Sequence, residues 1–95
     1  MVVEIIWQRP IFDRMDEIIR ANLGRVKEIS AALRRLNLLI TMNPKGAGES
    51  RQPPYRIITV NPVTLYFRST PSGKVVYIVG VEFNQRQRPT TEPES

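Results

Sequence analysis

The stretch from Tyr55 to Phe83, YRIITVNPVTLYFRSTPSGKVVYIVGVEF, decides the fold of this chain. It holds three runs rich in β-branched and aromatic residues, at about 55–60, 63–68 and 74–83. Such residues favour strands, and the connections at Asn61-Pro62 and at 70–73 are short, so the stretch predicts three consecutive antiparallel strands. The last run is apolar on both faces, which is typical of a strand in the middle of a sheet.

The segment before this stretch predicts one more strand and two helices. VVEIIW at residues 2–7 is short and rich in β-branched residues, so we expect a strand that pairs with the run at 74–83. Apolar residues then recur every three or four positions from Pro10 to Asn43, with a break at 22–24. This spacing predicts two amphipathic helices that form a hairpin.

The predicted order is therefore β-α-α-β-β-β, an α+β fold. We expect an antiparallel sheet of about four strands with the helical hairpin packed on one face, and an opposite face that is partly open and basic. Lys45 to Pro54, KGAGESRQPP, has no large apolar residue and no periodicity, which predicts a loop. We expect one domain over residues 1–88 and a disordered tail at 89–95, where the sequence is polar and rich in proline.

The composition excludes several kinds of chemistry. The chain has no histidine and no cysteine, which removes disulfides, thiolate nucleophiles and the usual zinc ligands. We therefore expect no metal and no other cofactor. No apolar run approaches the roughly 18–20 residues that span a bilayer, so we expect a cytoplasmic protein that does not enter the membrane.

The charge of the chain is positive and unevenly placed. Fourteen Lys and Arg face nine Asp and Glu, a net charge of +5, and most of the cations are arginines. Seven of the cations but only two of the acids lie in residues 45–88. Because arginine recognises phosphate and carboxylate groups well, a nucleic acid or an acidic protein is one interpretation. A solvated surface that keeps the protein soluble is the other.

The order of elements and a few short motifs resemble the RelE/ParE superfamily of type II toxins, which includes plasmid stabilisation proteins. The motifs are a helix that ends at Asn43-Pro44, Gly48-Glu49 a few residues later, Tyr55-Arg56-Ile57, and Leu65-Tyr66-Phe67. The resemblance covers about residues 2–88. It implies a toxin encoded beside an antitoxin, an extended or helical segment of which wraps around the toxin.

Two activities and one alternative follow from this resemblance. RelE-like toxins bind the ribosome and cut messenger RNA by driving a ribose 2′-hydroxyl onto the adjacent phosphate, which inhibits translation. ParE-like toxins inhibit DNA gyrase and lack nuclease residues. The third hypothesis is a non-catalytic binding module on the same scaffold.

The resemblance also implies roles for individual residues. Arg56 falls on the position of a catalytic cation in RelE-like nucleases, Glu49 is a candidate base, and Arg86 is a displaced substitute for a basic residue near the end of the family's domain. Ile58 and Val63 stand where such enzymes usually carry further cations, so the catalytic set is incomplete. The candidate RNA-binding residues are Lys45, Arg51, Arg56, Arg68 and Arg88.

Two leucines of the second predicted helix are candidates for binding a partner. Leu38 and Leu39 widen the apolar side of that helix near its C-terminal end. We expect Leu38 in particular to be exposed in the monomer. Either an antitoxin or a second copy of the chain, in a homodimer, would then cover this surface.

Overall fold

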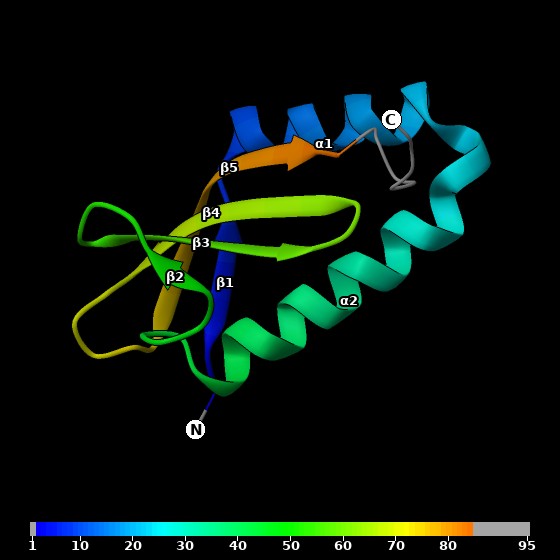
Figure 1. Cartoon of the computed structure of the whole chain (residues 1–95). Helices are drawn as coiled ribbons and strands as arrows, with labels where there is room; N and C mark the ends of the chain where they lie inside the picture. The colour runs from blue at the N-terminus through cyan, green and yellow to red at the C-terminus, as the bar shows by residue number, and fades with distance from the viewer. Residues whose placement is uncertain (1, 85–95) are drawn as a thin grey trace, which may run out of the picture.

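The computed structural model describes residues 2–84 of the chain (Figure 1). Its fold is α+β, as the sequence predicts. The elements are β1 (Glu4–Trp7), α1 (Arg9–Ala21), the short 3-10 helix η1 (Leu23–Arg25), α2 (Val26–Met42), β2 (Glu49–Ser50), β3 (Tyr55–Val60), β4 (Val63–Ser69) and β5 (Val75–Phe83). Arg86, Arg88 and the predicted tail at 89–95 lie outside the described residues.

The sheet has five strands in the order β1-β5-β4-β3-β2. The antiparallel meander of β3, β4 and β5 and the place of β1 beside β5 are as predicted. Two details differ from the expected antiparallel sheet of about four strands. β1 runs parallel to β5, which makes the sheet mixed, and β2 adds a fifth strand within the predicted loop by pairing with β3.

The two helices lie on one face of the sheet and diverge from η1 in an open V (Figure 1). Pro10 stands in the first turn of α1, where its missing N–H is not needed. The amide nitrogen of the Asn22 side chain donates to the carbonyl of Ile18 at 2.8 Å and closes the same helix. The helical hairpin is therefore present, but its two helices separate as they leave the turn.

The core lies between the helices and the sheet. α2 buries Ile29, Leu36 and Ile40 completely, and these side chains belong to the same apolar cluster as Phe67 of β4 and Ile78 of β5. Burying several large aliphatic and aromatic side chains in this way is the main favourable term in the folding of a domain of this size. These apolar residues therefore determine which side of the sheet faces the helices.

The face of the sheet without helices carries a mixture of groups. Paired residues on neighbouring strands point to the same side, so the register assigns this face. It includes Glu49, Tyr55, Ile57, Tyr66, Arg68, Tyr77 and Glu82. Two of these residues are acids and one is an arginine, and Arg51 lies beside Glu49 on the same face. These charges balance, so the open face is not the basic surface that the charge count predicts.

Candidate functional site

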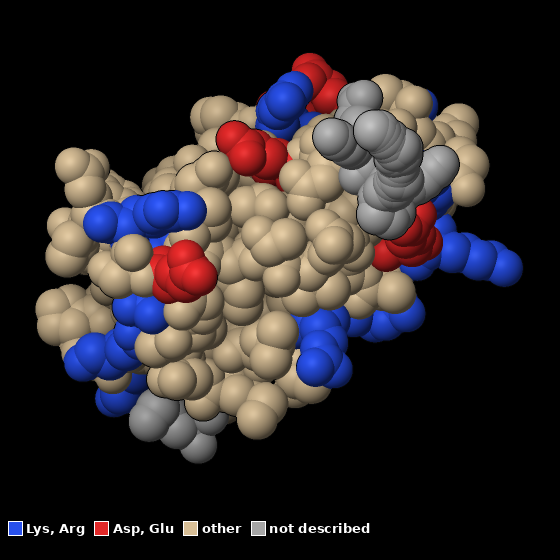
Figure 2. Space-filling view, viewed as in Figure 1, with Lys and Arg blue, Asp and Glu red and all other residues tan. Residues whose placement is uncertain are grey.

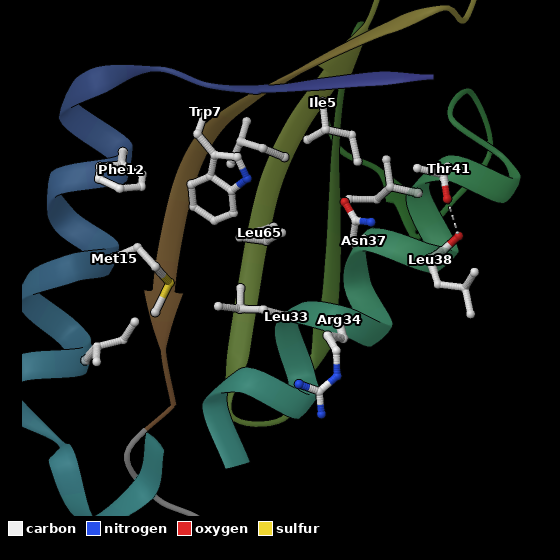
Figure 3. Close-up of a pocket in the computed structure, with 13 residues that line it drawn as sticks. Ile5, Trp7, Phe12, Met15, Leu33, Arg34, Asn37, Leu38, Thr41 and Leu65 are labelled. Atoms are coloured by element: carbon white, nitrogen blue, oxygen red, sulfur yellow. Dashed lines mark hydrogen bonds between the residues drawn. The ribbon is translucent and has the colours of Figure 1, made fainter. Parts of the chain in front are cut away.

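An apolar groove runs between α1, α2 and the helix-facing side of the sheet (Figure 3). Its volume is about 670 Å³. Trp7 points from β1 into the space between the helices, with Leu65 of β4 behind it and Met15 on α1 beside it. The groove exists because the helices diverge, which leaves the facing sides of their apolar stripes without a helix to pack against.

Two large apolar side chains beside the groove remain exposed to solvent. Phe12 of α1 is 58% exposed and Leu38 of α2 is 52% exposed. Small monomeric proteins rarely leave a contiguous apolar surface open unless it is an interaction site. Of the two leucines that the sequence singles out, Leu38 lies at the groove, whereas Leu39 is half-buried and packs against the core.

Several residues of the groove are not among the sequence-based candidates. Trp7, Phe12 and Asn37 line it, and their patterns in the sequence do not differ from those of core or surface residues. The one available signal is the breadth of the apolar side of α1, where Ile11 and Phe12 are adjacent. The angle between the helices, which opens the groove, cannot be deduced from hydrophobic periodicity.

The α2 side of the groove is positively charged. Arg34 lines the groove and Arg35 follows it on the same helix. Between Glu28 and Glu49 the chain carries no acidic residue. A segment that occupies the groove therefore meets an apolar surface with positive charge along one side.

A second surface lies at the end of the sheet that carries β2 and the loops. Figure 2 shows Lys and Arg side chains gathered over this end of the molecule, next to acidic atoms. Here the Arg56 side chain binds the loop that follows α2. Its Nε donates to the carbonyl of Ala47 at 2.7 Å, and its Nη2 donates to the carbonyls of Gly46 and Gly48, each at 3.1 Å. Arg56 thus fixes the loop from which β2 begins.

Lys45 and Arg68 are also held by uncharged groups. The Lys45 ammonium donates to the carbonyl of Pro71 at 2.6 Å, which joins the loop after α2 to the turn between β4 and β5. The Arg68 guanidinium lies 4.5 Å from the centre of the Tyr77 ring, a cation–π contact. These two cations and Arg56 line a pocket of about 560 Å³.

The candidate catalytic residues do not meet at one place. Glu49 pairs with Ile57 and lies on the open face, whereas Arg56 pairs with Phe67 and lies on the helix-facing side. Because side chains alternate along a strand, the Glu49 carboxylate and the Arg56 guanidinium point to opposite sides of the sheet. Arg86 lies outside the described residues, so the structure brings no complete catalytic set together within residues 2–84.

Glu49 and Arg51 line a smaller pocket of about 330 Å³ beside Ile57 and Thr59. Tyr66 pairs with Ile57 on this face, and its pKa is raised, first by burial and then by the neighbouring Glu82 carboxylate. The positive charge of Arg51 acts on the pKa of Tyr66 in the opposite direction but is weaker. At neutral pH the phenol of Tyr66 is therefore protonated.

The described part of the chain shows neither a metal site nor a membrane helix. Residues 2–84 contain no group of three or more acidic side chains placed to hold a metal ion. No helix in this part of the chain is long and apolar enough to cross a bilayer.

The chain matches no model of a protein family and no curated protein. The groove, the cations and the sequence motifs are therefore the features of this chain that bear on its function.

Proposed function

We propose that this protein is the toxin of a type II toxin–antitoxin pair, that it acts in the cytoplasm, and that the apolar groove binds a segment of its antitoxin. The groove carries this proposal, because Trp7, Phe12 and Leu38 form an apolar surface that a partner protein would bury. The motifs that resemble the RelE/ParE superfamily support the role of a toxin. Of the residues in these motifs, Leu65 lines the groove and Arg56 binds the loop that follows α2.

The charge beside the groove favours an acidic partner over a second copy of the chain. In a symmetric dimer whose twofold axis passes beside Arg34, the Arg34 side chains of the two copies would lie close together. Like charges that are brought together at an interface cost binding free energy. An amphipathic helix with apolar residues on one side and Asp or Glu beside them satisfies both the apolar surface and Arg34.

The contacts of Arg56 favour a toxin that binds its target over one that cuts RNA. A catalytic cation has to contact the phosphate that becomes more negatively charged in the transition state. The Nε and Nη2 atoms of Arg56 already donate to three carbonyls, and Glu49 lies on the other face of the sheet. A ParE-like action on a target protein such as DNA gyrase requires no such catalytic set.

The proposal is tested by expressing the protein in bacteria with and without the small protein encoded by the adjacent gene. We expect growth arrest without new messenger RNA ends, and recovery when the adjacent protein is present. Inhibition of DNA supercoiling by the purified protein would identify gyrase as the target. Growth arrest with messenger RNA cleavage would support the RelE-like activity instead, and an absence of arrest would support a non-catalytic binding module.

Two variants of α2 separate the groove from the rest of the helix. Leu38→Glu places a carboxylate in the groove, whereas Met42→Glu makes the same kind of change at an exposed residue outside it. We expect the Leu38→Glu protein to arrest growth even when the antitoxin is present, because the antitoxin no longer binds. Met42→Glu should still be neutralised. Equal neutralisation of both variants would contradict the proposed role of the groove.

A further inference from the structure

The two edges of the sheet differ in how they are protected. An edge strand presents backbone N–H and C=O groups that can pair with a strand of another chain, and proteins limit this with short strands, charged residues and proline. The β2 edge has these features, because β2 spans two residues and is followed by Arg51 and Pro53-Pro54. The β1 edge reads EIIW and carries neither a proline nor a cation. Pairing with another chain is therefore hindered at β2 and open at β1.

The β1 edge is also accessible. Within residues 2–84, β1 is the last strand of the sheet on its side, and none of its four residues is buried. By contrast, Val76 and Ile78 of the neighbouring β5 are fully buried. In this part of the chain, no further strand pairs with the free side of β1.

The backbone of β1 directs alternate residues to its free side. The Glu4 N–H donates to the Lys74 carbonyl at 2.9 Å, where the parallel pairing with β5 begins. In a parallel pair, a residue whose N–H and C=O bond to the neighbouring strand is followed by one whose groups point the other way. Glu4 therefore bonds to β5. The odd-numbered residues Val3, Ile5 and Trp7 offer their N–H and C=O groups to the free edge.

The side chains of these three residues are apolar and lie on the helix-facing side of the sheet. Ile5 and Trp7 line the groove (Figure 3), and Val3 packs against the core. Two antiparallel copies of β1 related by a twofold axis at Ile5 would pair Ile5 with Ile5, and Val3 with Trp7. Each of these pairs can exchange two N–H···O=C bonds. Glu4 of one copy would lie opposite Ile6 of the other, so no two carboxylates would face each other.

We infer that β1 is a self-association edge, at which two copies of this chain join their sheets into one continuous sheet across a twofold axis at Ile5. The register supports a second copy as the partner, because this axis uses the free backbone groups of all three odd-numbered residues. An axis at Glu4 would use backbone groups already bonded to β5 and would place two carboxylates opposite each other. The contact involves the backbone of β1 rather than α2. This inference goes beyond the proposed function and does not rest on it.

The first test is sedimentation equilibrium of the purified full chain over a range of concentrations. A contact between two short strands is small, so we expect a weak equilibrium between monomer and dimer, with a dissociation constant on the order of 100 μM. Each copy carries a net charge of +5 and the contact contains no ion pair, so higher salt should strengthen the dimer by screening the repulsion. A chain that stays monomeric at about 1 mM would overturn the inference.

Amide hydrogen exchange locates the contact in the unmodified protein. The Ile5 amide should exchange more slowly as the protein concentration rises, because it is free in the monomer and bonded in the dimer. By the alternation along β1, the Ile6 amide bonds to β5 in both forms and is the internal control. A dimer that leaves the exchange of Ile5 unchanged forms elsewhere on the molecule and contradicts the inference. Slower exchange of Ile5 only in the presence of the protein encoded by the adjacent gene would also contradict it, because β1 would then bind a strand of that protein.

Val3→Pro and Val2→Pro are a matched pair of variants at neighbouring valines. Proline lacks the N–H, so Val3→Pro removes a donor that the dimer uses, whereas Val2→Pro removes one outside the proposed pairing. Val3→Pro removes one hydrogen bond from each of two symmetric pairs and should weaken the dimer about tenfold or more, whereas Val2→Pro should weaken it less than about threefold. Circular dichroism of dilute samples checks that both monomers fold. Equal weakening by the two variants would show that the proposed register is wrong.

Discussion

Four cations of the helical segments and three cations at the loop end of the sheet are held by different kinds of partner. Each of Arg9, Arg14, Arg20 and Arg25 pairs with a carboxylate three or four residues away. Lys45, Arg56 and Arg68 contact backbone carbonyls or an aromatic ring instead. These four helix cations are thus neutralised, while Lys45, Arg56 and Arg68 are positioned and keep their charge available. This difference separates a solvated surface from one suited to binding an anion.

The largest change in stability is expected in the loop that Arg56 binds. Gly48 has a φ of +70°, and a Cβ added there would lie 2.2 Å from the carbonyl oxygen of Ile57. Gly48→Ala should lower the free energy of unfolding by about 2–4 kcal/mol, because it combines a left-handed backbone with a backbone clash. Urea denaturation measures this loss. Gly24→Ala is the control, since nothing lies within 4 Å of its added Cβ.

Removing the Arg56 side chain should have the next largest effect. Arg56→Ala leaves the carbonyls of Gly46, Ala47 and Gly48 without their donor, and we expect a loss of about 1.5–3 kcal/mol in urea denaturation. Arg56→Lys should recover only part of it, because an ammonium cannot reproduce the planar guanidinium. A full recovery by lysine would show that charge alone matters at this position.

An ion pair on a helix should contribute much less to the free energy of unfolding. Arg20 Nε lies 2.8 Å from Asp16 Oδ2, but both side chains are largely exposed. Arg20→Ala should change the free energy of unfolding by no more than about 0.5 kcal/mol, and less at high salt. If Arg20→Ala lowers the free energy of unfolding as much as Arg56→Ala does, the two groups of cations do not differ in how firmly they are held.

The smallest expected effect is the pH dependence of the Arg25–Glu28 pair. The pKa of Glu28 is lowered, mainly by its hydrogen bond with Arg25, and that of Arg25 is raised by the same contact. Because the pKa of Glu28 is lower in the folded state, the pair stabilises the protein at pH values above the pKa of Glu28 in the unfolded chain, about 4.3. This stabilisation is lost as the pH falls through the pKa of Glu28 in the folded protein. Denaturation of wild type and Glu28→Gln should therefore differ at neutral pH and converge in acid. A difference that persists in acid would contradict this assignment.

The sequence predicts what depends on neighbouring residues. The helices, the three-stranded meander and the pairing of β1 with β5 follow from periodicity and turn residues. β2 could not be predicted, because Glu49 and Ser50 have no strand pattern and pair only where the Arg56-bound loop places them. The groove could not be predicted either, because periodicity identifies the apolar side of each helix but not the angle between the two helices.

The same limit decides which properties of the candidate site residues could be predicted from the sequence. Leu38 is exposed as expected, because its exposure depends on its position around a single helix. The partners of Arg56 and Lys45 lie 8 to 26 residues away along the chain, so no local pattern reveals them. The assignments of catalysis to Arg56, Arg86 and Glu49 stay predictions.

The pairing of β1 with β5 sets the time at which the sheet can form during synthesis. Residues 4–7 leave the ribosome well before residues 75–78, with which they pair. Until β5 has been made, Ile5 and Trp7 of β1 lack the strand with which they pair. Contacts between residues so distant in sequence form late in folding. We expect β1 to be ordered only after β5 has been translated, so a ribosome that stalls before Val75 would hold a nascent chain with an incomplete sheet.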